Sequence, residues 1–319
     1  MQPLTLVTGS AGHLGEAMVR TLRALGAPVR GLDRIASPFT DVVGSIVDPE
    51  VVDTAMAGVT QVVHAATLHK PHVATHTRQA FIDTNLTGTL NLLEAAVRAR
   101  VRAFVFTSTT STFGDALVPP ADAPAAWITE AVSPVPKNIY GVTKVAAEDL
   151  CALAHRNQQL AVVVLRTSRF FPDADDDPAA RDAYPDANLK ANELLNRRVD
   201  IEDVVTAHQL ALERAPAIGF ARYIISATTP LARGDTEALR RDAAGVLRRH
   251  VPGIDATYAA LGWRLPPSID RVYDNARARG ELGWQPRHDF ASVIARVAAG
   301  GSLASELARS IGVKDYHPR

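Results

Sequence analysis

Three glycines directly after an apolar run constrain the fold of this chain most. The stretch G-S-A-G-H-L-G follows the apolar run Leu4–Val7 and precedes a helical pattern. A phosphate approaches the backbone closely only where no side chain intervenes, and its charge is best met by free N–H groups at a helix N-terminus. The stretch predicts a phosphate-binding turn for a dinucleotide, with contacts from Gly9, Gly12, His13, Leu14 and Gly15. Similar turns also serve purely structural purposes, so the motif needs support from the rest of the chain.

An acidic residue ends the next apolar run. Val29–Leu32 is followed by Asp33, whose carboxylate can accept hydrogen bonds from the ribose hydroxyls of an adenosine. The same carboxylate repels a 2′-phosphate, so the pattern favours NAD over NADP. Arg34 comes next and has the opposite effect, because a guanidinium attracts that phosphate.

The charge balance excludes several classes of partner. The 319 residues include 34 Lys and Arg and 34 Asp and Glu, so no overall basic field attracts nucleic acid or an anionic membrane.

Cys151 is the only cysteine, which excludes an intrachain disulfide and a cysteine-rich zinc site. No apolar segment reaches membrane-spanning length, and no signal peptide precedes the first strand. We expect a cytoplasmic protein that acts on a small molecule.

Short apolar runs alternate with longer helical patterns. The predicted strands are Leu4–Val7, Val29–Leu32, Gln61–His64, Ala103–Phe106, Ala161–Leu165 and Tyr223–Ile225. The predicted helices are Leu14–Leu25, Arg78–Ala99, Tyr140–His155, Asn188–Arg198 and Glu237–His250. The alternation predicts an α/β fold with a doubly wound, Rossmann-like parallel sheet. We expect a cofactor domain at residues 1–170, onto which residues 199–227 pack back, and a smaller α/β domain at 171–319 that mainly binds substrate.

An acidic stretch follows the last strand of the first domain. Pro172–Pro185 is rich in aspartate, alanine and proline and is predicted to be a loop. Its carboxylates Asp175, Asp176 and Asp177 suggest a metal site or a solvated turn that leads into a helix, and the second interpretation is favoured.

Three histidines raise the same question. His69, His72 and His76 have spacings that place imidazoles on one helical face, as in some zinc sites. Pro71 and the lack of a carboxylate or cysteine partner argue against a metal. We expect no metal here and a polar loop over the nicotinamide, from which Lys70 and His72 reach the substrate.

Hydroxyl side chains and a tyrosine–lysine pair predict a catalytic site. Ala103–Phe106 runs into T-S-T-T-S-T-F-G, and Tyr140 and Lys144 follow as Y-x-x-x-K. On a helix these two positions share a face, so we expect the ammonium to lower the pKa of the phenol. Tyr140 can then take a proton from a substrate hydroxyl while a hydride leaves. Chance pairs of this kind are common on protein surfaces, but the hydroxyl-rich strand end favours the catalytic interpretation.

Together these motifs resemble the extended short-chain dehydrogenases/reductases, the family of NAD-dependent epimerases and dehydratases. The matching residues beyond the turn and Asp33 are His64-Ala65-Ala66, Asn85, Phe113-Gly114, Tyr140, Lys144, Asp274, Arg277 and Leu282-Gly283-Trp284-Gln285-Pro286. The resemblance implies that Thr109, Tyr140 and Lys144 are catalytic. It also implies cofactor contacts from Arg34, Asp48, His64, Ala65, Ala66, Asn85, Thr107, Tyr140 and Lys144.

The resemblance is weaker around the substrate. Arg169 stands where the nucleotide-sugar enzymes usually carry an asparagine, and Asn196 replaces a usual arginine. The segment between Asn188 and Arg198 is too short to hold the insert that helps to cover a nucleotide. Arg264, however, coincides with an arginine that epimerases use on the substrate diphosphate.

A compact pocket with an arginine resembles the sugar-acid dehydrogenases of this family, in which a guanidinium holds a carboxylate. The alternative for Arg169 and Arg264 is pairing with the acidic loop Asp173–Asp177. The implied substrate residues are Lys70, Ser108, Thr109, Arg169, Asn188 and Arg264.

Three functions follow as hypotheses. The first is an NAD-dependent dehydrogenase or reductase of a small polar, sugar-like or acidic substrate. The second is a nucleotide-sugar 4-epimerase with tightly held NAD. The third is a non-catalytic NAD(P)-sensing protein, against which the intact set of Thr109, Tyr140 and Lys144 argues. The family resemblance and the aliphatic helices Arg78–Ala99 and Tyr140–His155 also imply a homodimer.

Overall fold

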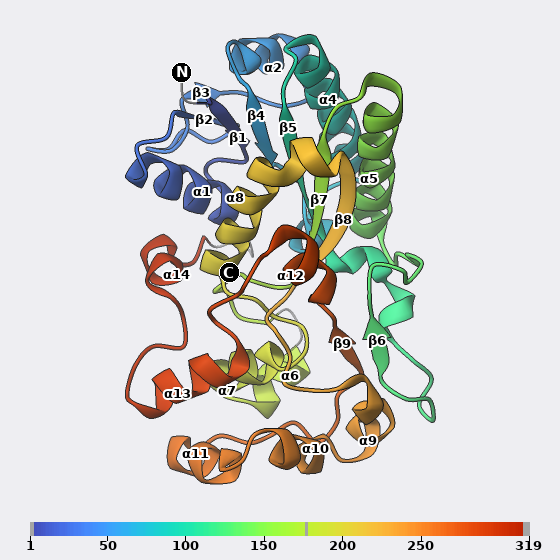
Figure 1. Cartoon of the computed structure of the whole chain (residues 1–319), viewed down its shortest axis with the longest axis vertical. Coiled ribbons are helices and arrows are strands. Elements are labelled where there is room, and N and C mark those ends of the chain that lie inside the picture. Colours follow the sequence, from blue (N-terminus) through green and yellow to red (C-terminus); the bar gives the residue numbers. More distant parts are fainter. Residues whose placement is uncertain (1–2, 176–177, 315–319) are drawn as a thin grey trace.

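A seven-stranded parallel sheet forms the centre of the molecule in a computed structural model, which describes residues 3–175 and 178–314 (Figure 1). Its strand order is β3-β2-β1-β4-β5-β7-β8. The strands are β1 (Thr5–Thr8), β2 (Val29–Asp33), β3 (Val42–Val43), β4 (Gln61–His64), β5 (Ala103–Thr109), β7 (Val162–Thr167) and β8 (Phe220–Ile225). The prediction of a doubly wound, Rossmann-like sheet is confirmed.

Alternating strand residues fill two separate cores, one on each face of the sheet. Val7, Val63 and Val105 pack on one face with helices α1 (His13–Ala24) and α8 (Ile201–Ile218). Leu6, Val62 and Phe104 pack on the other face with α2 (Pro49–Met56), α4 (Gly88–Arg98) and α5 (Ile139–Gln158). Because both faces are covered, the strands read as continuous apolar runs rather than alternating ones.

The helix predicted over Arg78–Ala99 has an internal irregularity. It consists of α3 (Arg78–Ile82), a π-helical turn at Asp83–Thr87, and α4. The buried Asn85 lies in this turn. Such turns insert one extra residue into a helix and redirect the side chains around them.

A third core lies below the sheet in Figure 1, where residues mainly from the C-terminal half pack around Tyr258, Val272 and Phe290. Here β6 (Ala126–Ile128) and β9 (Arg271–Tyr273) pair in parallel, at residues far apart in the sequence. The helices of the C-terminal part are α6 (Pro178–Ala183), α7 (Asp186–Leu194), α9 (Thr236–Arg241), α10 (Ala243–His250), α11 (Ile254–Leu261), α12 (Ala276–Leu282), α13 (Phe290–Ala298) and α14 (Glu306–Ile311).

Two expectations about these elements need correction, and one helix was missed. The helix predicted over Glu237–His250 is interrupted at Asp242, whose side chain accepts a hydrogen bond from Gly245 N at 2.8 Å and begins α10. The stretch Pro172–Pro185 contains the short helix α6 rather than a continuous loop. The long helix α8 was not predicted, although its residues pack against the sheet. Asp176 and Asp177 of the predicted acidic turn lie outside the described residues.

None of the helices within the described residues combines the length and apolar character needed to cross a membrane.

The carboxyl ends of β1, β4, β5 and β7 face the C-terminal part of the chain, since all seven strands are parallel. In open sheets of this kind, ligands bind in the crevice at these strand ends.

Candidate active site

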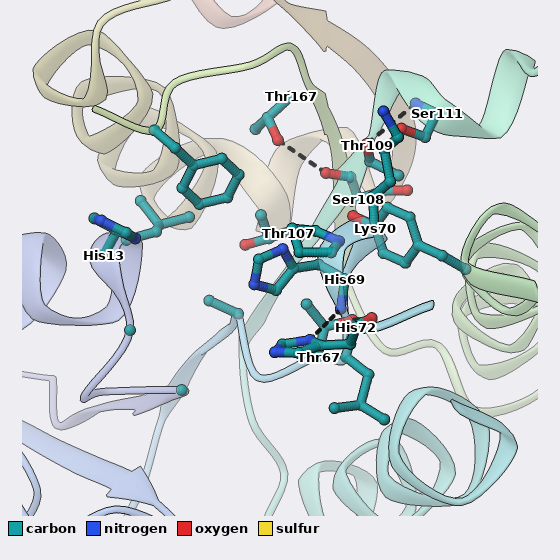
Figure 2. Close-up of a pocket in the computed structure, with 18 of the residues that line it drawn as sticks. His13, Thr67, His69, Lys70, His72, Thr107, Ser108, Thr109, Ser111 and Thr167 are labelled. Atoms are coloured by element: carbon teal, nitrogen blue, oxygen red, sulfur yellow. Dashed lines mark hydrogen bonds between the residues drawn. The ribbon is translucent and has the colours of Figure 1, made fainter. Parts of the chain in front are cut away.

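A cavity of about 770 Å³ lies at the carboxyl ends of the strands. Ligand pockets in proteins usually enclose about 300–1,000 Å³. Figure 2 shows His13 on one side of the cavity, and Ser108, Thr109 and Ser111 on the other in this view. Residues from the ends of β2, β5 and β7, from the loops after β1 and β4, and from the start of α5 line it.

The glycine turn leaves no room for side chains on its inner side. Gly9 has φ +73°, and a Cβ on it would lie 2.8 Å from the backbone nitrogen of Ala66. A Cβ on Gly15 would lie 1.9 Å from the carbonyl oxygen of Gly9. Gly12 is the N-cap residue of the twelve-residue helix α1, and no side chain caps the first N–H groups of this helix. The geometry therefore fits a dinucleotide whose phosphates meet the backbone N–H groups of this helix.

Asp33 is held at the end of β2 by two backbone amides. Its Oδ2 accepts a hydrogen bond from Ala11 N and its Oδ1 accepts one from Ile35 N, both at 2.9 Å. Each carboxylate oxygen retains a second lone pair for a further donor. Asp33 and Arg34 both line the cavity.

His13 connects the turn to the segment that follows β7. Its Nε2 lies 3.3 Å from Asp173 Oδ2, and its ring meets Phe171 edge-on with the centroids 5.3 Å apart. Burial lowers the pKa of His13 to about 4, although the nearby Asp173 carboxylate acts in the opposite direction. The imidazole is therefore neutral at neutral pH.

Tyr140 and Lys144 enter the site from the first turns of α5. This helix begins after Asn138, whose side chain accepts a hydrogen bond from Gly141 N at 3.0 Å. The Tyr140 side chain is buried and hydrogen-bonds the side chain of Thr109. The Lys144 ammonium donates to the carbonyl oxygen of Thr107 at 2.7 Å.

The pKa values of this pair are governed by burial. Burial raises the pKa of Tyr140 to about 12, although the hydrogen bond from Thr109 acts against it. Burial lowers the pKa of Lys144 to about 7, although the Glu148 carboxylate acts against it. The expectation that the ammonium lowers the pKa of the phenol is therefore wrong for the chain without a bound cofactor, because desolvation of the phenolate outweighs that effect.

A buried ionic network joins the end of β5, next to Thr109, to helix α5. The Glu148 carboxylate accepts a hydrogen bond from the Ser108 hydroxyl at 2.6 Å and from Arg166 Nη2 at 2.7 Å. Arg222 Nε also donates to it, at 3.0 Å. The Ser108 hydroxyl thus contacts a residue of α5, while Thr109 contacts Tyr140.

The histidines of the loop after β4 lie next to one another. The ring centroids of His69 and His72 are 4.4 Å apart, and those of His72 and His76 are 5.0 Å apart. His69 also stacks on Phe171. Within the described residues, no group of three or more His, Cys, Asp or Glu side chains is arranged to hold a metal ion. Lys70 lines the cavity beside these rings.

The residues of this site lie within the part of the chain that matches a known protein family. The model of the NAD dependent epimerase/dehydratase family matches residues 5–220, which include the glycine turn, Asp33, Tyr140 and Lys144. This chain belongs to that family.

Members of the family with different activities are similar to the chain. It is 26% identical over 318 residues to a UDP-glucose 4-epimerase of Lactobacillus helveticus, covering 89% of this chain and 92% of that protein. It is 32% identical over 333 residues to a dTDP-glucose 4,6-dehydratase of Streptomyces antibioticus, covering 91% and 90%. A short-chain dehydrogenase/reductase superfamily protein from Agrobacterium tumefaciens, solved with bound NAD, superposes with a TM-score of 0.68 at 26% identity and covers 96% and 97%.

Most residues predicted from the family motifs line the cavity. These are Gly9, Gly12, His13, Leu14, Gly15, Asp33, Arg34, Ala65, Ala66, Lys70, Thr107, Ser108, Thr109, Tyr140 and Arg169. Lys144 lies just beneath them, as its bond to Thr107 shows.

Three predicted cofactor residues have their side chains elsewhere. Asp48 caps α2, where its Oδ1 accepts a hydrogen bond from Glu50 N at 2.9 Å. His64 is buried between the hydroxyls of Thr8 and Thr89, at 2.8 and 2.9 Å. Its burial lowers the pKa of the imidazole well below the usual range. These contacts assign packing roles to both residues.

Asn85 also contacts protein rather than the cavity. Its Oδ1 accepts a hydrogen bond from Leu68 N, and its Nδ2 donates to Leu68 O, both at 2.9 Å. Its Nδ2 also donates to Thr143 Oγ1 at 3.0 Å. Asn85 therefore ties the loop after β4 to the helix of Tyr140, and it shapes the cavity without lining it.

Two predicted substrate residues lie outside the lining. Asn188 hydrogen-bonds the backbone of Arg264 through both ends of its amide, at 3.0 and 2.9 Å. The Arg264 guanidinium donates to the carbonyl oxygen of Ala183 and lies over the Tyr184 ring. Arg169 does line the cavity, and it also binds Asp175 at 2.8 Å, as the alternative of pairing with the acidic loop predicted.

Several residues that line the cavity were not predicted from the sequence. They are Lys137, Glu193, Arg197, Arg271, Tyr273 and Lys314. None of them belongs to a motif, and β9, which carries Arg271 and Tyr273, was not predicted. Only the packing of distant segments brings them to the cavity.

Proposed function

We propose that this protein is an NAD-dependent dehydrogenase that oxidises a secondary alcohol, or reduces the ketone, of a small polar, sugar-like or acidic substrate. One observation carries the proposal: Tyr140 hydrogen-bonds Thr109 one helical turn before a buried lysine, at the cavity that the glycine turn enters. This arrangement supplies an acid/base group, a second hydroxyl for the substrate oxygen and a cation in one place.

The reaction follows from these side chains. Bound NAD supplies the hydride acceptor and, in its oxidised form, a positive charge close to the substrate. Thr109 orients the substrate hydroxyl, and Tyr140 receives its proton as the C–H hydride leaves, so that an alcohol becomes a ketone. The positive charge of Lys144 stabilises the phenolate form of Tyr140, and this effect must offset the burial that raises its pKa.

The cofactor assignment follows the same side chains. We assign the dinucleotide phosphates to the turn Gly9–Gly15 and the adenosine ribose to Asp33. The fixed carboxylate favours NAD over NADP, because it repels a 2′-phosphate. Ala65, Ala66, Thr107 and Lys144 lie toward the nicotinamide end, whereas Asp48, His64 and Asn85 support the fold around it.

The domain roles are part of the proposal. Residues 1–170 would bind the cofactor, with 199–227 packed against them, and 171–319 would mainly bind substrate. The pairing of β8 with β7 and the third core of the C-terminal helices support this division. A cytoplasmic location stays a prediction.

A homodimer is also proposed. Leu90, Leu153 and Val142 are exposed apolar side chains on α4 and α5. These helices pack side by side at one edge of the molecule (Figure 1). Two copies of this surface would bury each other across a two-fold axis.

The other activities of the family are less well supported. Elimination of water, as in a dehydratase, needs a further acid or base beside the reacting carbons. The carboxylates that line the cavity within the described residues are Asp33, Asp173 and Glu193, and none belongs to the strand end of Thr109. A 4-epimerase would need only the same tyrosine and a cofactor that keeps its hydride, so it remains the second candidate.

The fate of the hydride tests the proposal. We expect purified protein supplied with NAD and a panel of sugars, sugar acids and polyols to form NADH, seen by its near-ultraviolet absorbance. NAD that copurifies in stoichiometric amounts, together with interconversion of UDP-glucose and UDP-galactose without added NAD, would establish the epimerase instead.

A further inference from the structure

Cations outnumber carboxylates among the cavity-lining residues away from the glycine turn, although Lys137, Arg169 and Arg271 also bind carboxylates outside the lining. Outside the turn and the Asp33 region, the lining contains the cations Lys70, Lys137, Arg169, Arg197 and Arg271. The carboxylate that lines the same region, Glu193, already binds Arg197 at 3.1 Å and Arg198 at 2.7 Å. The phosphates of a dinucleotide belong at the turn, so they do not neutralise these cations.

Arg271 is the most deeply placed of the arginines among these cations. Its side chain is 15% exposed, against 23% for Arg169 and 32% for Arg197. It binds the Asp270 carboxylate at 2.7 Å through Nη1. It also hydrogen-bonds Tyr273, which lies two residues further along β9 and lines the same cavity.

One donor of this guanidinium has no acceptor. Arg271 Nε is buried and makes no hydrogen bond to any of the described residues. Leaving a buried polar group without a hydrogen-bond partner is unfavourable, and more so when the group is charged. This guanidinium therefore has an unused donor, which an oxyanion in the cavity could engage once the side chain turns toward it.

A second unsatisfied group lies on the same cavity. The Ser168 hydroxyl, which follows directly after β7, is buried and has no hydrogen-bond partner within the described residues. Ser168 lines the cavity together with Arg271. A donor of this kind complements the guanidinium in binding the oxygens of an anion.

The position of β9 relates this region to the reacting groups. Tyr273 packs in one cluster with Phe113 and Leu117. Phe113 ends the short helical turn that begins directly after Thr109, the last residue of β5. Tyr273 therefore lies close to the strand end that carries Thr109, and Arg271 lines the same cavity.

We propose that Arg271, supported by Tyr273 and Ser168, is the subsite that recognises an anionic group of the substrate, a carboxylate or a phosphoryl group. The inference rests on the proposed function, because it takes the ligand of this cavity to be the substrate of the dehydrogenase. The sequence assigned this role to Arg169 and Arg264. Arg169 is paired with Asp175, as Arg271 is with Asp270, but it is more exposed than Arg271, and Arg264 lies over Tyr184 outside the lining.

Calorimetric binding to the NAD-loaded protein tests the subsite independently of turnover. Three matched pairs of probes serve: D-glucuronate against D-glucose, D-glucose 6-phosphate against D-glucose, and UDP-glucuronate against UDP-glucose. We expect the protein to prefer the anionic member of at least one pair. The first and third pairs report a carboxylate, and the second reports a phosphoryl group.

Arg271→Gln should reduce that preference by about tenfold to a hundredfold, since a hydrogen bond to a charged group contributes about 1.5–3 kcal/mol. Arg264→Gln is the matched control and should leave the preference unchanged. Thermal unfolding reports whether Arg271→Gln folds. If it does not, Arg271→Lys replaces it and should still weaken the preference, because an ammonium cannot reproduce the planar fork.

Two results would overturn the inference: no preference for the anion in any pair, or a preference that survives replacement of Arg271. Failure of the proposed function gives a different result. Anion binding that depends on Arg271 without NADH formation from any substrate would support the subsite and refute the dehydrogenase. NADH formation from a neutral substrate, with no anion preference, would support the dehydrogenase and refute the subsite.

Discussion

The Ser108 hydroxyl donates a hydrogen bond of 2.6 Å to the Glu148 carboxylate. Ser108 precedes Thr109, the proposed catalytic residue, on β5, and Glu148 lies on α5 one turn after Lys144 and two turns after Tyr140. This contact therefore joins the strand and the helix that carry the proposed catalytic groups. Arg166, from the neighbouring strand β7, fixes the same carboxylate.

The first prediction concerns the stability of this network. Glu148→Gln should lower the free energy of unfolding by about 3–5 kcal/mol, because removing one partner leaves the buried Arg166 charge uncompensated. Asp149→Asn is the control. Its side chain is 73% exposed and binds Arg222 at 3.2 Å, so we expect a loss of about 1 kcal/mol or less. Urea unfolding of the two variants measures both, and equal effects would contradict the structural role of Glu148.

The second prediction concerns the acid/base group. Tyr140→Phe should lower turnover by about two to four orders of magnitude, the usual contribution of general acid–base catalysis. Its affinity for NAD, measured by calorimetry, should change little, because the ring that lines the cavity is retained. Tyr184→Phe serves as the control, since Tyr184 lies outside the cavity lining. Turnover equal to that of the parent would refute the assignment of Tyr140.

The third prediction concerns cofactor preference. The parent should bind NAD more tightly than NADP, and Asp33→Asn should narrow this difference by about tenfold, which corresponds to 1.4 kcal/mol. Asp48→Asn should leave the difference unchanged, because Asp48 caps a helix away from the cavity. Titration of both cofactors at one salt concentration measures the ratio. An unchanged ratio in Asp33→Asn would mean that Arg34 or another residue governs the preference.

The fourth prediction concerns association. The parent should have the mass of a dimer by light scattering at micromolar concentration, and Leu153→Glu should have that of a monomer, because a charge in the centre of the proposed interface would be buried without a partner. Leu25→Glu changes an exposed leucine at the end of α1 and should remain dimeric. A monomeric parent, or a dimer in both variants, would place the interface elsewhere or exclude it.

Local patterns made part of this site predictable. The glycine turn, Asp33 and the tyrosine–lysine pair each depend on short spacings along one strand, turn or helix. The structure places the turn, Asp33 and Tyr140 at one cavity, with Lys144 just beneath its lining. Their partners are not local. Glu148 binds Arg166 and Arg222, which lie 18 and 74 residues further along the chain, and no spacing indicates that pairing.

The differences between the predicted and the observed lining residues also arise from contacts between distant segments. A motif fixes where Arg264 lies in the sequence but not where its guanidinium points, and Tyr184 and Ala183 hold it outside the lining. Arg271 reaches the cavity because β9 pairs with β6, whose residues are more than a hundred positions away. The sequence contains no signal for that pairing. Substrate recognition was thus the least predictable part of the site.

The last prediction concerns the titration of Lys144. Burial lowers the pKa of this ammonium from 10.5 to about 7, so between these two pH values the unfolded chain holds a proton on Lys144 that the folded chain releases. Stability rises with pH wherever the unfolded state binds more protons, by up to about 1.4 kcal/mol per pH unit for one group. In cofactor-free protein, the free energy of unfolding of the parent should therefore rise from pH 7 to 9 relative to that of Lys144→Met, in urea unfolding at each pH. Lys137→Met removes a half-exposed lysine paired with Asp115 and serves as the control for replacing a lysine by methionine. A pH-independent difference for Lys144→Met would show that Lys144 keeps its proton in the folded chain throughout this range.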